Sequence, residues 1–312
     1  MKKVPAKVLE VRKNVPELRE DVIHLSYSHL STFMTCPKQW YMQYVEKIAP
    51  YQPSIHTVFG TATHETIQEW VRVLYEEAVK KGEEMNLSEL LQENMLRVFR
   101  DQREQNGNKN FSSPKELQEF YQDGLAILEF LKKHRKQYFN SKGVYLAGIE
   151  TLLYQEIAKN VYFKGYIDLV LYDEDLDKWT LLDLKTSTSG WNQYAKSDFK
   201  KIAQLLLYKE FFAKQFNIDV DKIEVVYLIL KRKINEDAEY ASMKKRIQEF
   251  SPPSGKIKRG QVLKEVQDFL EKAISSEGTY LIKEHTPMPD KFTCKFCSFA
   301  ETGQCDASFY KK

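Results

Sequence analysis

Residues 161–187 read VYFKGYIDLVLYDEDLDKWTLLDLKTS, and this stretch decides the fold. Two runs rich in β-branched, aromatic and leucine residues, 161–172 and 179–185, flank an acidic segment at 173–177. Such runs are typical of β-strands, and the acidic segment between them predicts a turn. We therefore expect two adjacent strands, the second of which ends in charged residues.

Three of the charged residues in these strands carry the argument: Asp168, Asp183 and Lys185. Side chains alternate along a strand, so Asp183 and Lys185 project to the same face, and an antiparallel neighbour could bring Asp168 alongside them. Two carboxylates that converge repel each other unless a cation lies between them. Because oxygen ligands suit Mg²⁺ or Mn²⁺, the pattern predicts a divalent metal site.

The alternative interpretation is a surface hairpin with ordinary charged residues, since Asp-x-Lys is a common sequence. The apolar neighbours Leu182 and Leu184 disfavour it, because charges in a buried strand cost free energy unless something pairs with them.

The rest of the chain predicts an α/β fold. Further elements are expected as helices at 28–44, 61–81, 87–104, 114–139, 199–216 and 258–274, and as strands at 150–157 and 223–230. This order predicts a mixed β-sheet core flanked by helices, with a helical N-terminal addition. We expect four regions, namely an extended lead-in at 1–22, a helical region at 23–144, the core at 145–285 and a cysteine-rich segment at 286–312.

Composition sets limits on the partners. The chain has 312 residues, of which 42% are hydrophobic, so it can bury a core, but its net charge is only +3. A nucleic-acid partner must therefore be argued from local basic runs. Each run by itself is more simply a solvated face; the four runs are Lys196/Lys200/Lys201, Lys231/Arg232/Lys233, Lys244/Lys245/Arg246 and Lys256/Lys258/Arg259.

No stretch approaches the roughly 18 apolar residues of a membrane span, and residues 1–20 lack an apolar signal-peptide core. We therefore expect a cytoplasmic protein without a membrane partner. In a reducing compartment the four cysteines are better explained as metal ligands or free thiols than as disulfides. Cys294 and Cys297 are spaced to meet one soft metal centre, and four thiolates, with Cys36 and Cys305, fit a [4Fe–4S] cluster or Zn²⁺ equally well.

The motif Gly165-Tyr-Ile-Asp168, followed by Asp183-Leu-Lys185, resembles the core motif of the RecB-like branch of the PD-(D/E)XK nucleases. Two other stretches resemble motifs of that branch in the expected order: Gly60-Thr-Ala-Thr-His64 and Gln204-Leu-Leu-Leu-Tyr208. The resemblance implies a restriction-endonuclease-like core. It also implies that His64 assists Asp168 and Asp183 in binding metal, and that Gln204 and Tyr208 line the active site. Glu150 could assist the metal or could be a solvated strand end.

One cysteine far upstream, followed by Pro37, and three near the C-terminus resemble the iron–sulfur nucleases of this branch, which include the AddB nuclease domain and the standalone exonuclease of CRISPR adaptation. The resemblance implies that Cys36, Cys294, Cys297 and Cys305 bind a [4Fe–4S] cluster that ties the two ends of the chain together. The spacing from Cys297 to Cys305 is longer than the spacing expected between the last two cysteines of these iron–sulfur nucleases.

The expected function is a Mg²⁺- or Mn²⁺-dependent DNA exonuclease that prefers single strands, in phage, CRISPR or recombination pathways. Lys185 would serve the attacking water or the transition state. The sequence has no Gly-x-x-x-x-Gly-Lys-Ser/Thr loop, so a helicase or a CRISPR adaptation protein would be a separate partner. Two alternatives are a catalytically idle DNA-binding scaffold subunit of a helicase–nuclease complex and a zinc-stapled adaptor.

Overall fold

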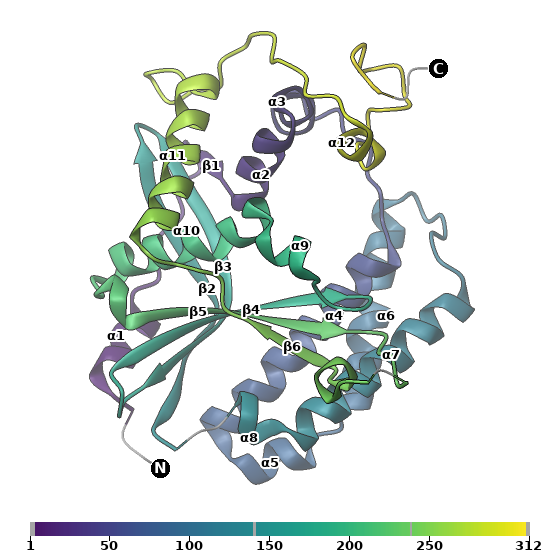
Figure 1. Ribbon diagram of the computed structural model, residues 1–312, viewed down its shortest axis with the longest axis vertical. Coiled ribbons are helices and arrows are strands. Elements are labelled where there is room, and N and C mark those ends of the chain that lie inside the picture. Colours follow the sequence, from purple (N-terminus) through teal and green to yellow (C-terminus); the bar gives the residue numbers. More distant parts are fainter. Residues whose placement is uncertain (1–3, 140–141, 238, 310–312) are drawn as a thin grey trace.

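The computed structural model describes residues 4–139, 142–237 and 239–309, and within them one mixed sheet runs through the centre of the molecule (Figure 1). Its strands are β1 (Ile23–Leu25), β2 (Val144–Ala158), β3 (Val161–Asp173), β4 (Lys178–Ser187), β5 (Ile223–Lys231) and β6 (Ile247–Phe250). The expected α/β class with a mixed sheet between helices is confirmed.

Strand β3 is the centre of this sheet, and its two edges differ. Along one edge, β2 pairs antiparallel with β3 over almost the whole length of β3. On the other edge β1 pairs in parallel with residues 161–163, and β4 pairs antiparallel with residues 169–173. Residues 164–168 therefore have no strand partner on that edge. We call this interval of β3 the strand gap.

Helix α10 (Phe199–Phe216) connects β4 to β5, which pair in parallel over their whole length. A parallel neighbour requires such a crossover, whereas hairpins suffice for the antiparallel pairs β2–β3 and β3–β4. Asp198 caps the start of α10 and Asn217, in the left-handed conformation, ends it. This crossover places α10 directly above the centre of the sheet.

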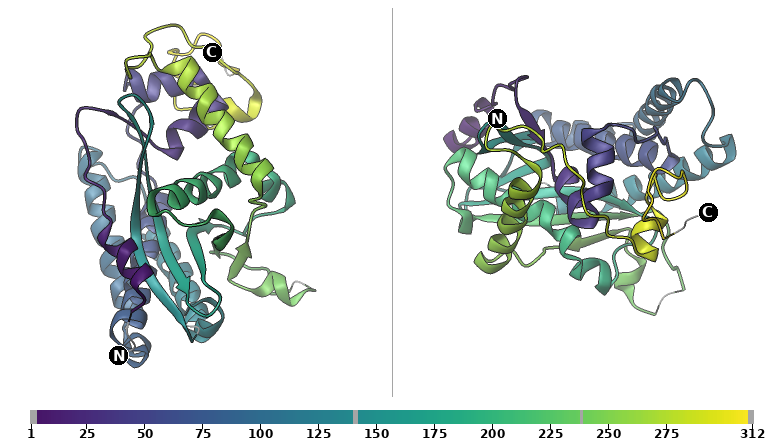
Figure 2. Two further views of the ribbon diagram at one scale, coloured as in Figure 1. Left: turned by 90° about the vertical axis from the view of Figure 1, so that its left-hand side faces the viewer. Right: turned by 90° about the horizontal axis from the view of Figure 1, so that it is seen from above.

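Helices cover both faces of the sheet, so the molecule has three layers (Figure 2). Two buried clusters of hydrophobic residues hold the layers together, one on each face. One face is covered by α1 (Ala6–Lys13), α2 (Tyr27–Thr35), α3 (Pro37–Trp40), α10 and α11 (Lys256–Ala273). The other is covered by α4 (Ile55–Arg72), α6 (Leu87–Gln105) and α7 (Pro114–Lys133). The short helices are α5 (Val79–Glu84), α8 (Arg135–Tyr138), α9 (Gln193–Ser197) and α12 (Lys291–Lys295).

The N-terminal part of the chain differs most from the expectation. The lead-in at 1–22 is not extended throughout, because Ala6–Lys13 forms α1, which buries Val8 and Val11 in the core; residues 1–3 lie outside the described part. The region 23–144 is not only a helical addition, since its first three residues form β1 of the central sheet. The N-terminal segment is thus part of the core.

Two long expected helices are divided. The helix expected at 28–44 breaks at Cys36, which is extended between α2 and α3, and continues as a π-helical turn at Tyr41–Val45. The helix expected at 61–81 begins earlier, at Ile55, where Ser54 caps it, and ends in a second π-helical turn. The break places the Cys36 side chain at a corner between two helices.

In the part of the chain that is described, none of the helices combines the length and the apolar character of a membrane span.

Candidate active site

The two aspartates meet where β3 and β4 part. The last backbone-paired residues are Leu169 and Leu182, so the register places Asp168 opposite Asp183 at the next position. There, Asp168 Oδ2 accepts a hydrogen bond of 2.6 Å from the Leu184 amide. A side-chain carboxylate thus takes the place of a backbone carbonyl, and both aspartates lie at the edge of the strand gap.

Asp183 is 2% exposed, and its Oδ2 lies 2.7 Å from Lys185 Nζ. The two groups form a buried ion pair, and this oxygen makes no well-aligned hydrogen bond with the described groups. Burial raises the pKa of Asp183 to about 6; Lys185 opposes this shift, and the charge of Asp168 adds to it. A buried carboxylate whose charge is balanced by a neighbouring lysine is a candidate cation ligand.

Burial also raises the pKa of Asp168 to about 6, although the Leu184 amide and Lys185 oppose the change. His64, on α4, places Nδ1 3.7 Å from Asp168 Oδ2. Burial lowers the pKa of His64 to about 4, which leaves its imidazole neutral near pH 7 and able to act as a metal ligand. The helix reaches the sheet closely here, because Gly60 packs against Thr186 of β4.

Glu150 lies on β2, between the register pairs Ile149–Leu169 and Thr151–Ile167, so it faces Asp168 across the strands. Its φ of 47° is unusual for a residue other than glycine inside a strand. Its carboxylate accepts a 2.5 Å hydrogen bond from the buried Gln68 of α4, and its charge raises the pKa of both Asp168 and His64. The fold therefore brings Glu150 to the border of the site, with its side chain exposed.

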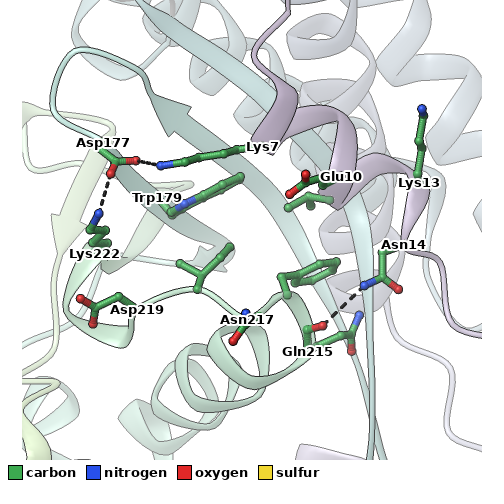
Figure 3. Close-up of a pocket in the computed structure, with 13 residues that line it drawn as sticks. Lys7, Glu10, Lys13, Asn14, Asp177, Trp179, Gln215, Asn217, Asp219 and Lys222 are labelled. Atoms are coloured by element: carbon green, nitrogen blue, oxygen red, sulfur yellow. Dashed lines mark hydrogen bonds and ion pairs between the residues drawn. The ribbon is translucent and has the colours of Figure 1, made fainter.

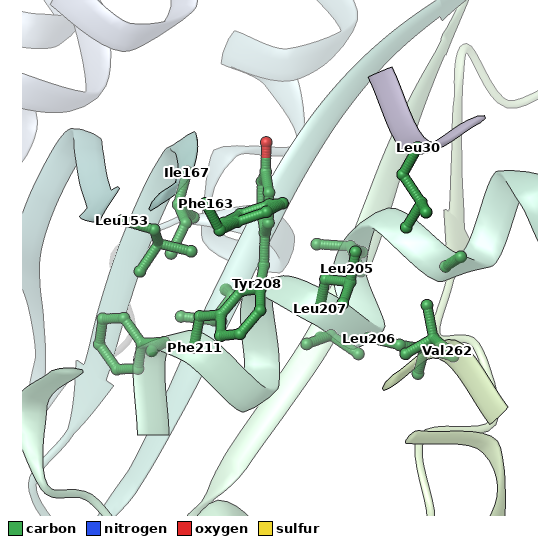
Figure 4. Packing of buried hydrophobic residues seen from close by; sticks show 14 of the residues in the cluster. Leu30, Leu153, Phe163, Ile167, Leu205, Leu206, Leu207, Tyr208, Phe211 and Val262 are labelled. Atoms are coloured by element: carbon green, nitrogen blue, oxygen red, sulfur yellow. The ribbon is translucent and has the colours of Figure 1, made fainter. Parts of the chain in front are cut away.

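Helix α10 covers the strand gap with Gln204 and Tyr208. Gln204 Nε2 donates to the Tyr208 hydroxyl at 3.2 Å. Tyr208 is buried among Phe163, Ile167 and Phe211 (Figure 4), and its ring would lie 2.9 Å from a Cβ atom at Gly165. Burial raises the pKa of Tyr208, and the charges of Asp183 and Asp168 raise it further.

Tyr227 was not expected in the site. It is the register partner of Asp183 on β5, it is fully buried, and Lys185 Nζ lies 5.9 Å from the centre of its ring. Burial and the Asp183 charge raise the pKa of Tyr227. Its hydroxyl donates to the Lys201 carbonyl at 2.7 Å, which fixes the start of α10 above β5. Only the β4–β5 register could have revealed it.

The residues gathered here fit a divalent cation by their chemistry, because two carboxylates and a neutral imidazole converge, and one carboxylate oxygen lacks a hydrogen bond. They do not form a ready-made cage. Among the described residues, no three His, Cys, Asp or Glu side chains stand close enough together to hold an ion as they are. Lys185 accompanies Asp183 instead, so binding a cation requires these side chains to adjust.

The four cysteines line one small cavity between α3 and the C-terminal segment. Cys36 and Cys294 are buried, and each sulfur accepts a backbone amide, from Met288 at 3.4 Å and from Phe309 at 3.5 Å respectively. Burial raises the pKa of Cys297, and the other three thiols raise it further. The four sulfurs therefore face a common space, although they too are not drawn together into a closed site.

A separate cavity of about 670 Å³ lies at the other end of β4, between α1 and the turn after β3 (Figure 3). Asp177 joins Lys7 and Lys222 across its rim, and Trp179 lines its wall. None of the expected site residues lines this cavity, so it is distinct from the strand gap.

Comparison with known proteins gives one family. The sequence model of the PD-(D/E)XK nuclease superfamily matches residues 24–303. Among solved structures, that of a candidate exonuclease from Eubacterium rectale aligns with 87% of this chain and 85% of its own, at 11% identity and a TM-score of 0.48. No match was found among curated proteins.

Proposed function

Because this chain belongs to the PD-(D/E)XK nuclease superfamily, we propose that it is an active, metal-dependent nuclease that hydrolyses phosphodiester bonds in DNA. One observation carries the proposal: at the strand gap the buried Asp183 pairs with Lys185, and Asp168, at the next register position, lies 3.7 Å from His64. An idle scaffold would have no need of a buried aspartate that costs stability.

In this proposal Asp168 and Asp183 hold Mg²⁺ or Mn²⁺, with His64 as a further ligand and Glu150 at the border. The bound ion would polarise the scissile phosphate and lower the pKa of the attacking water. Lys185, released from Asp183 when the cation arrives, would stabilise the negative charge that builds up on the phosphate. Gln204 and Tyr208, fixed to each other by a hydrogen bond, would orient the strand across the gap.

We further propose an exonuclease that prefers single-stranded ends and takes part in phage, CRISPR or recombination DNA processing. The support is the resemblance of the Gly60–His64, Asp168–Lys185 and Gln204–Tyr208 motifs to the RecB-like branch. A motor would come from a separate helicase or a CRISPR adaptation protein, since the sequence contains no phosphate-binding loop of the ATPase type.

The cysteine cavity is proposed to hold a [4Fe–4S] cluster. Four cysteines that line one space are the usual ligands of such a cluster, and amide donors to two of the sulfurs are the kind of contact that tunes it. Iron and sulfide analysis with a visible absorption spectrum of anaerobically purified protein tests this proposal. A colourless protein with one equivalent of zinc would replace the cluster by a structural Zn²⁺ site.

The nuclease test uses single- and double-stranded DNA labelled at either end, with Mg²⁺, with Mn²⁺ and without divalent ions. Asp183→Asn, Asp168→Asn and Lys185→Ala should each lower the cleavage rate by about 100-fold or more, because each removes a group from the reacting centre. Asp221→Asn, an exposed aspartate beyond α10, is the matched control and should cleave normally. Unchanged DNA binding without any cleavage would instead favour the scaffold function, and absence of DNA binding would favour the adaptor.

A further inference from the structure

Two of the four basic runs meet on one surface, where lysines lie over aromatic rings. Lys201 Nζ is 5.3 Å from the centre of the Trp191 ring, and Lys196 Nζ is 5.7 Å from that of Phe250. From α11, Lys258 Nζ lies 6.0 Å from the centre of the Phe199 ring at the start of α10. An aromatic face attracts an ammonium group, so each ring holds its lysine in place. We call these six residues the lysine–aromatic tract.

The three lysines of the tract keep their charge available. None of them takes part in an ion pair with the acidic residues of the part of the chain that the structure describes. The run at 231–233 is different: Lys231 and Arg232 are buried, and Lys233 pairs with Glu119 and Asp123. The positive charges of the tract therefore lack acidic partners among the described residues, whereas the run at 231–233 is buried or paired with acidic side chains.

The support of the tract is rigid. Gln248 on β6 holds the backbone of Trp191 at both ends: its Oε1 accepts from the Trp191 amide at 2.7 Å, and its Nε2 donates to the Trp191 carbonyl at 3.0 Å. The Tyr227 hydroxyl holds the Lys201 carbonyl in the same way. A pre-positioned surface loses less conformational entropy when a ligand binds.

The tract is continuous with the candidate active site. Lys185 lies over the Tyr227 ring, and that ring is 4.9 Å from Trp191 and 6.3 Å from Phe250, measured between ring centres. A chain of side-chain contacts therefore joins Lys185 in the strand gap to the lysines at the beginning of α10. The buried Tyr227 ring thus packs against both Lys185 and Trp191, so the tract lies beside the candidate active site, within reach of a polymer bound in the strand gap.

We propose that the lysine–aromatic tract binds the phosphates of a single DNA strand that runs to or from the strand gap. This inference rests on the proposed function and assigns its substrate a binding surface outside the strand gap. Basic side chains combined with aromatic rings are the means by which proteins bind single strands without reading their sequence. Three lysines without acidic partners complement such a strand by charge.

The first test measures the affinity for a labelled single-stranded oligonucleotide at several salt concentrations, without added divalent ions. The variant Lys196→Ala/Lys201→Ala/Lys258→Ala should bind more weakly. The slope of the logarithm of the association constant against that of the salt concentration should become shallower by about 2, since each phosphate contact on a single strand contributes about 0.7. The matched control replaces three exposed lysines of α10 and α11, the helices that carry Lys201 and Lys258, and should keep the wild-type slope; these lysines are Lys214, Lys264 and Lys272.

The second test uses tryptophan fluorescence of the full-length protein. Trp40, Trp70 and Trp179 are at most 2% exposed, whereas Trp191 is only partly buried, so a bound strand should perturb mainly Trp191. Adding the oligonucleotide should change the emission of the wild type, and Trp191→Phe should abolish most of this change.

Wild-type affinity and slope in the triple variant, with cleavage by the wild-type protein intact, would overturn the tract and leave the nuclease proposal standing. The proposal would also be overturned if the triple variant showed a shallower salt dependence with duplex DNA but the wild-type salt dependence with the single strand. The tract would then bind a duplex. Failure of the nuclease proposal has a different signature, namely that the wild type does not cleave either substrate with Mg²⁺ or Mn²⁺.

Discussion

At the scale of single residues, Gly165 of β3 packs closely against Tyr208 of α10. A Cβ atom there would lie 2.9 Å from Tyr208 Cε1 and 3.1 Å from Phe163 Cε1. Gly165→Ala should therefore push the Tyr208 ring away, lower the free energy of unfolding by about 1–3 kcal/mol, and slow DNA cleavage. Urea unfolding and single-turnover cleavage measure the two effects. Gly260→Ala, in an exposed part of α11 where an added methyl group meets nothing, should instead stabilise the protein by about 0.5–1 kcal/mol.

His29 makes the stability sensitive to acid. Burial lowers the pKa of His29 to about 4, and its Nδ1 accepts the Ser26 amide at 2.9 Å within the capping box of α2. The unfolded chain, in which histidine has its ordinary pKa near 6.5, binds the proton more readily. The free energy of unfolding should therefore fall as the pH drops from 6.5 to 4, and this residue should contribute no pH dependence above 6.5.

His29→Gln separates this effect from other titrations, because glutamine can complete a capping box but carries no proton. Between pH 6.5 and 4 the variant should lose about 2 kcal/mol less than the wild type, as measured by urea unfolding at each pH. Equal losses in both proteins would show that His29 does not titrate in this range.

Among the candidate site residues, the sequence pattern predicts those that carry charge. Asp168, Asp183 and Lys185 stand out because they interrupt apolar strands, and the alternation of side chains already places Asp183 and Lys185 on one face. Tyr227 could not be found in this way. An aromatic residue in a buried strand is ordinary, and its place beside Asp183 depends on the register of two strands joined by a helical crossover.

At the scale of elements, the N-cap of α10 can be tested directly. Asp198 Oδ1 accepts the Lys200 amide at 3.0 Å, at the start of an 18-residue helix that buries nine of its residues. Asp198→Ala should lower the free energy of unfolding by about 1 kcal/mol. Asn192→Ala removes the corresponding cap of α9, a five-residue helix without buried residues, and should cost clearly less. Equal effects of the two changes in urea unfolding would contradict this ranking.

Element length explains which parts of the fold the sequence predicts. The long strands β2 to β5 and helices α6, α7, α10 and α11 follow from hydrophobic periodicity, which needs several residues to show. Strands β1 and β6, with three and four residues, and helices α9 and α12, with five each, are too short to leave such a pattern. The strand gap depends on β1, so the frame of the site could not be predicted even though its charged residues could.

At the scale of the whole molecule, the cysteines offer a test of whether one centre joins the chain ends. If Cys36 and Cys294 bind the same metal centre, Cys36→Ser and Cys294→Ser should each release it and lower the melting temperature by a similar amount. The double variant should then be little worse than either single one, because the centre can be lost only once. Additive losses, with the metal content unchanged, would mean that the two thiols act independently.

Loss of such a centre should lower the melting temperature strongly, because the centre closes a long loop of the chain. Cys36 and Cys294 lie more than 250 residues apart, and the entropy cost of closing a loop rises with the logarithm of its length. The sequence indicated these four residues as potential ligands. It could not show that they border a single cavity, because that depends on the tail folding back onto the corner between α2 and α3.

The position of β1 also has a consequence during synthesis on the ribosome. Leu25 pairs with Phe163, so more than 130 further residues must be made before the partner of β1 exists. At a rate of 5–20 residues per second, the nascent strand waits for about 7–30 s. A segment of three residues is too short to recruit a wrong neighbour in that time. Because β1 has only three residues, it leaves no pattern in the sequence, and for the same reason it exposes little strand edge with which the growing chain could pair wrongly.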